Sequence, residues 1–171
     1  MSLAQSEATK AKVTVCFRAD GDSSIGLGHI VRSKALANVL EENGVNVVWA
    51  SCGGGGDMPN AVEKLYERKM RDGLDLKLPA GDDCDENQAK QVGSWVRKSK
   101  AAWIVLDHYK IDDSYLTHLH NAMRLDAGQN ETKIMIMDDH QFRFKQCHMR
   151  LAPMQIFETS KFPKGTNVVS L

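Results

Sequence analysis

The chain has 171 residues, of which 42% are hydrophobic and 26% are charged, as is typical of one globular domain. Its 22 Lys and Arg residues balance 22 Asp and Glu residues, so composition does not indicate a nucleic-acid-binding surface. No apolar run approaches the ~20 residues that span a bilayer. The four cysteines lack the CxxC spacing of zinc sites, and reducing cytoplasm is the simplest compartment for them.

The predicted elements alternate between strands and helices along the chain. A short β-branched run at residues 13–17 predicts the first strand, and apolar residues at helical spacing over residues 30–40 predict a helix that Gly44 ends. Further strands are expected at residues 45–52, 74–78, 103–106 and 134–137, with a short edge strand at residues 148–153, and further helices at residues 61–71, 86–100 and 112–124.

This alternation predicts the fold class. Buried strands that are joined by helices form a parallel sheet with right-handed crossovers. We therefore predict an α/β fold, Rossmann-like, with helices on both faces of the sheet. Residues 12–155 are expected to form this domain. Residues 1–11 are expected to be disordered or tag-derived, and residues 156–171 to form a C-terminal tail with little periodicity.

Polar side chains follow three of the predicted strands. They are Arg18 and Asp20 after the first strand, Asp107, His108 and Tyr109 after the strand at 103–106, and Asp138, Asp139 and His140 after the strand at 134–137. Ligands of open α/β sheets bind outside the carboxyl ends of the strands. The three clusters together therefore predict a binding site at this edge, although solvated strand ends would explain any single cluster equally well.

The stretch "IGLGHIVR" joins the first strand to the first helix. Gly26 and Gly28 bracket the turn, and the backbone N–H groups at a helix start favour an anion. Val31 replaces the third glycine of the dinucleotide fingerprint, so an NAD site is not indicated. His29 and Arg32 share a helix face, and a helix start favours the neutral imidazole that a general base requires. The alternative is a histidine that is merely packed or solvated.

Three motifs occur in order along the chain. They are "RADGDSSIGLGHIVRSKALANVLEENG" from Arg18, "WIVLDHYKID" from Trp103 and "IMIMDD" from Ile134, the last followed by Cys147. Together they resemble the UDP-sugar hydrolases of pseudaminic acid biosynthesis and their spore-coat-polysaccharide relatives. The resemblance implies the N-terminal half of a glycosyltransferase-B-like fold. It also implies a base that activates water to displace UDP from the anomeric carbon with inversion, without a metal or cofactor.

The resemblance assigns roles to residues of this chain. His29 would be the catalytic base, and the expected substrate-binding residues are Arg18, Asp20, Gly26, Gly28, Arg32, Asp107, His108 and Tyr109. The expected substrate is a nucleotide-linked deoxyamino sugar, with no nucleic acid or membrane partner.

One segment departs from the family pattern: after Cys147 the chain reads "CHMRLAPM", where the family reads like "CDLLLDQN". A second domain or a homo-oligomer is therefore expected to complete the cleft. Two alternatives stay open: a non-catalytic nucleotide-sugar binding or regulatory module, and a glycosyltransferase domain in which the same base serves an acceptor hydroxyl.

Overall fold

The computed structural model describes residues 12–21, 26–52, 76–79, 84–124, 131–137, 147–152 and 167–170. The strands are β1 (Thr14–Ala19), β2 (Asn46–Ser51), β3 (Leu76–Lys77), β4 (Trp103–Asp107), β5 (Lys133–Met137), β6 (Met149–Ala152) and β7 (Asn167–Ser170). The helices are α1 (Gly28–Glu42), α3 (Glu86–Lys98) and α4 (Asp113–Met123). The helix predicted at residues 61–71 lies outside the described residues.

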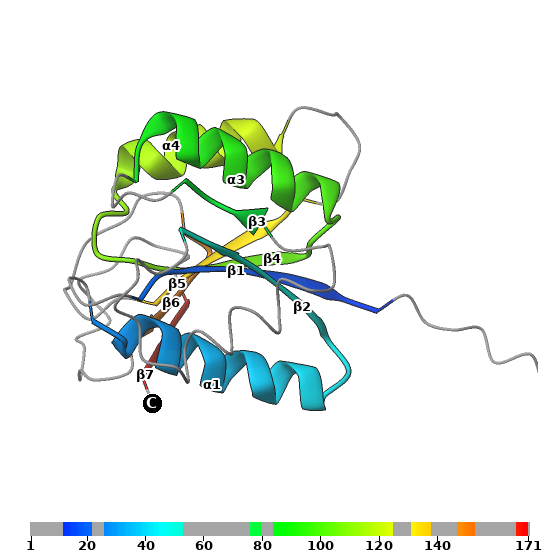
Figure 1. Cartoon of the computed structure of the whole chain (residues 1–171). Coiled ribbons are helices and arrows are strands. Elements are labelled where there is room, and N and C mark those ends of the chain that lie inside the picture. The colour runs from blue at the N-terminus through cyan, green and yellow to red at the C-terminus, as the bar shows by residue number, and fades with distance from the viewer. Residues whose placement is uncertain are drawn as a thin grey trace, which may run out of the picture.

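The sheet lies between two helical layers, with α1 on one face and α3 and α4 on the other (Figure 1). Its seven strands run in the order β3-β2-β1-β4-β5-β6-β7, and each neighbouring pair is parallel. The predicted α/β, Rossmann-like fold is therefore confirmed. None of the helices described is long and apolar enough to cross a lipid bilayer.

The sheet differs from the prediction at its last two strands. Residues 148–153 were expected to contain an edge strand, but β6 pairs with β5 on one side and with β7 on the other. The edge prediction is therefore wrong, because β7 lies within residues 156–171, where no periodic pattern marks a strand. The sheet extends into the segment that was expected to be a tail.

Alternation along the strands divides the core into two layers. Phe17 of β1 and Trp49 of β2 stack with ring centroids 4.9 Å apart on the α1 side. Cys16 and Ile104 point to the other side and pack with residues of α3 and α4. Those two helices lie close together, since a Cβ at Gly93 would meet the backbone oxygen of Leu119 at 2.8 Å. The same alternation places Arg18 and Asp107 on opposite faces of the sheet.

The connections between strands locate the expected binding edge. From β1 the chain winds through α1 to β2 and onward to β3, and it returns to the other side of β1 at β4. The strand order therefore reverses between β1 and β4, whose last residues, Ala19 and Asp107, are partners in register. Open α/β sheets bind ligands at such a switch point, beyond the carboxyl ends of the strands.

Candidate functional site

Asp107, the last residue of β4, is the centre of a buried polar cluster on the α1 face. His29 Nδ1 lies 2.5 Å from its Oδ1, and Arg32 Nε donates to its Oδ2 at 2.7 Å. Arg32 Nη2 also donates to Oδ1, and Ser33 Oγ donates to Oδ2 at 3.0 Å. Arg32 and Ser33 lie three and four residues after His29 on α1, so one helix face holds the carboxylate.

The surroundings of Asp107 keep its carboxylate charged. Burial acts to raise the pKa of Asp107, but hydrogen bonds and charge from Arg32 and His29 outweigh burial and hold the pKa below its ordinary value. A 2.5 Å contact between an ionised carboxylate and a ring nitrogen requires a proton between them, so Nδ1 of His29 carries hydrogen. In the neutral ring, Nε2 then carries the lone pair.

The imidazole of His29 is held in place on several sides. His29 is 2% exposed. The Tyr109 ring meets the imidazole edge-on with centroids 4.1 Å apart, and the His108 ring stacks with it at an interplanar angle of 24° and a centroid distance of 6.2 Å. Nε2 is buried and has no hydrogen-bond partner among the described residues. A fixed ring with one nitrogen bound to a carboxylate and the other unpaired is the arrangement of an oriented general base.

Arg18 is the centre of a second buried cluster, on the face that α3 and α4 cover. Its Nη1 lies 2.6 Å from Asp20 Oδ2, and its Nη2 donates to Gln88 Oε1 at 3.0 Å. Asp20 Oδ1 accepts hydrogen bonds from Ser51 Oγ at 2.9 Å and from the backbone N–H of Cys52 at 2.8 Å. Burial acts to raise the pKa of Asp20, but Arg18 and the backbone N–H of Cys52 outweigh it, so the pKa is lowered.

His108 lies between the two clusters. It follows Asp107 directly and is 8% exposed. Its Nε2 is 3.6 Å from Asp20 Oδ2, while its ring stacks with that of His29. The two faces of the sheet edge are therefore connected through one histidine.

The described part of the turn before α1 leaves space beside the start of the helix. Gly26 has φ of 81°, a conformation that favours glycine. A Cβ at Gly28, the first residue of α1, would meet none of the described residues within 4 Å. No side chain among the described residues caps α1, whereas Asp85 caps α3 and Asp112 caps α4. Within the described ranges, the first N–H groups of α1 are thus available to water or to an anion.

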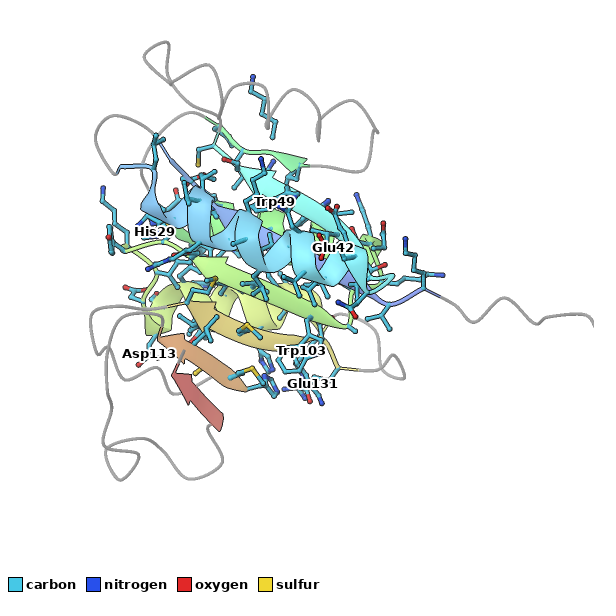
Figure 2. All side chains as sticks on the ribbon, turned by 90° about the horizontal axis from the view of Figure 1, so that it is seen from below. His29, Glu42, Trp49, Trp103, Asp113 and Glu131 are labelled. Carbon is cyan, nitrogen blue, oxygen red and sulfur yellow. The ribbon has the colours of Figure 1, made fainter. Side chains whose placement is uncertain are left out.

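The structure brings most of the predicted site residues to the carboxyl edge of β1 and β4. Figure 2 shows His29 and Asp113 at this end of the sheet, with Glu42, Trp103 and Glu131 toward the other end. Arg18 lies on the opposite face from His29 and is fully buried, so its contact with a substrate stays a prediction. Asp138, Asp139 and His140 lie outside the described residues.

Sequence reasoning missed five partners of these clusters: Ser33, Ser51, Cys52, Cys84 and Gln88. Ser33 is four residues after His29, and Ser51 and Cys52 are the last two residues of the strand predicted at residues 45–52, so helical spacing and strand position could have indicated all three. Cys84 and Gln88 carry no such signal, because only the folded chain brings the start of α3 beside Arg18 and His108.

Within the described ranges, no three His, Cys, Asp or Glu side chains are arranged to hold a metal ion. No model of a known protein family matches the chain, and no curated protein sequence matches it significantly.

Proposed function

We propose that this domain hydrolyses a UDP-linked deoxyamino sugar with His29 as the general base, as the motifs' resemblance to the hydrolases of pseudaminic acid biosynthesis implies. One observation carries the proposal. Asp107 holds Nδ1 of His29 at 2.5 Å, and Nε2 is left buried and unpaired among the described residues, at the switch point of the sheet. A structural histidine would ordinarily pair both ring nitrogens when buried.

The reaction follows from this proton arrangement. His29 Nε2 accepts a proton from a water molecule while the water oxygen attacks the anomeric carbon. The bond between that carbon and the phosphate oxygen breaks, and its electron pair leaves with UDP. Attack from the side opposite the leaving group inverts the anomeric centre. The imidazolium that forms shares its Nδ1 proton with Asp107, whose carboxylate balances the new charge.

The turn at Gly26 and Gly28 supports the choice of a diphosphate leaving group. No described side chain caps the N–H groups at the start of α1, and no described residue fills the space beside Gly28, so both suit phosphate oxygens. His29 is the second residue of the same helix, so the base and the anion-binding turn lie together. A second domain or a second copy of the chain would supply the remaining contacts with the nucleotide.

The test measures UDP release from a UDP-linked deoxyamino sugar by the full chain and by two variants. His29→Ala removes the base, and Asp107→Asn removes the carboxylate that fixes its proton. Each is expected to lower turnover by at least about a hundredfold. His120→Ala is the matched control, because His120 contacts Glu131 at an exposed position and is expected to keep full activity.

The outcomes separate the proposal from its alternatives. Circular dichroism verifies that each variant is folded. Unchanged turnover in His29→Ala would contradict the role of the base. Binding of the UDP-sugar by calorimetry, without any UDP release by the unaltered chain, would instead support a binding module. Formation of a glycoside with an added acceptor alcohol would support a transferase.

A further inference from the structure

Cys84 forms a hydrogen-bonded pair with His108. Cys84 lies directly before Asp85, the cap of α3, and its Sγ is 3.2 Å from Nδ1 of His108. The backbone N–H of Lys110 donates to the same nitrogen at 3.1 Å. Nδ1 therefore carries a lone pair, and the proton of the Cys84 contact belongs to the thiol.

The other nitrogen of His108 faces a carboxylate. With Nδ1 acting as the acceptor, Nε2 carries the ring proton, and it lies 3.6 Å from Asp20 Oδ2. Asp20 is held in its charged form by Arg18, so it would balance an imidazolium at His108. A nucleophile, a base and a carboxylate that balances the charge of the base are thus in sequence, as in cysteine enzymes with covalent mechanisms.

The guanidinium of Arg18 places positive charge in the surroundings of Cys84. Arg18 interacts electrostatically with Cys84, and its side chain is hydrogen-bonded to Tyr115. Because Arg18 has only donors, it donates in that bond, and no described residue accepts the hydroxyl proton of Tyr115. A nearby positive charge stabilises the thiolate that acts as a nucleophile.

The other cysteines provide comparisons within the same chain. Cys16 is fully buried in β1, and Cys52 is buried where Arg18 and Gln88 donate to its sulfur. Cys147 is partly buried like Cys84 and packs against the same apolar core. Reactive thiols lie in partly exposed, electropositive surroundings. Cys84 combines partial exposure with the guanidinium of Arg18 and the base His108.

We propose that Cys84 is a nucleophilic thiol that a hydroperoxide oxidises to a sulfenic acid. His108 Nδ1 accepts the thiol proton, and Sγ attacks the terminal oxygen of the peroxide. The O–O bond breaks, and the departing oxygen takes the proton from His108 and leaves as water or an alcohol. The sulfur loses two electrons and the peroxide gains two, so no further reductant takes part.

The experiment treats the full chain with hydrogen peroxide, traps sulfenic acid with dimedone and measures each cysteine by mass spectrometry over time. Cys84 is expected to be labelled at least about tenfold faster than Cys147 in the same molecules. His108→Asn is expected to slow labelling of Cys84 by about tenfold and to leave Cys147 unchanged.

Equal labelling rates at Cys84 and Cys147 in the unaltered chain would overturn the proposal, and this comparison needs no variant. In a His108→Asn chain shown to be folded by circular dichroism, an unchanged Cys84 rate would also overturn it. The labelling does not depend on UDP release, so it stands or falls separately from the hydrolase function.

Discussion

The two buried clusters at the sheet edge each contain one arginine and one aspartate, but opposite charges stand at their centres. On the α1 face, donors from three side chains converge on the carboxylate of Asp107. On the other face, the guanidinium of Arg18 is the centre and faces Asp20, Gln88 and Cys52. A central anion can fix the proton of a histidine, whereas a central cation attracts a thiolate or an oxygen. One sheet edge can therefore serve two kinds of chemistry.

The clusters also differ in the exposure of their arginines. The side chain of Arg32 is 18% exposed, whereas that of Arg18 is 1% exposed. An ion pair that water cannot reach depends entirely on its protein partners, because desolvation of each charge must be offset within the fold. The Arg18 cluster is thus expected to matter more for stability, and the Asp107 cluster more for chemistry.

The largest expected difference is in the free energy of unfolding after loss of each arginine. Arg18→Met leaves the buried Asp20 without its main counter-charge and is expected to cost about 3–5 kcal/mol. Arg32→Met is expected to cost about 1–2 kcal/mol, because Asp107 keeps its contacts with His29 and Ser33 and the side chain of Arg32 is partly exposed. Urea denaturation measures both values. Equal losses would show that exposure does not separate the clusters.

The two aspartates should couple stability to pH in the same direction. Both have a pKa below the ordinary value of 3.8, so the unfolded chain takes up protons first as the pH falls. Stability is expected to be intact above about pH 5 and to decline as the pH falls below about 4. Asp107→Asn should make this decline shallower. Each unit by which the pKa of Asp107 differs between the folded and the unfolded chain accounts for about 1.4 kcal/mol of the loss of stability.

Urea midpoints measured across this pH range test the coupling. The matched variant Asp20→Asn should flatten the decline as well. An acid decline as steep in both variants as in the unaltered chain would contradict the role of the two carboxylates.

The smallest expected effect concerns one hydroxyl in each cluster. Ser33 Oγ donates to Asp107 at 3.0 Å, and Ser51 Oγ donates to Asp20 at 2.9 Å. Ser33→Ala and Ser51→Ala are each expected to lower the free energy of unfolding by about 1 kcal/mol. Thermal unfolding compares them. If one variant loses several times more free energy of unfolding than the other, its cluster contains the carboxylate that depends more on the serine hydroxyl.

Most of the fold was predictable because the buried strands have distinctive sequences. β4 and β5 are continuous apolar runs followed by carboxylates, and such runs are typical of strands covered on both faces. β7 was missed, because Asn167–Ser170 lies in a segment whose sequence shows little periodicity. β6 was therefore placed at the edge, although its own strand character was recognised.

The site was predictable as a location and less so as a set of contacts. His29 and Asp107 were both expected at the carboxyl edge. Their direct contact depends on the pairing of β1 with β4, which puts Ala19 beside Asp107. Arg18 is separated from His29 because its side chain points to the face of the sheet that α3 and α4 cover, whereas α1 carries His29 on the other face. Neither the strand order nor the face could be read from the local sequence.

The central place of β1 has a consequence for how the chain folds. His29 and Asp107 are 78 residues apart in sequence, and they meet only after β4 has docked beside β1. Closing so long a loop lowers the entropy of the chain before the new contacts can stabilise it, so non-local parallel pairing is slow. The helix that carries His29 can form from local contacts much earlier. We therefore expect the His29–Asp107 contact to appear among the last events of refolding, as a marker that the sheet is complete.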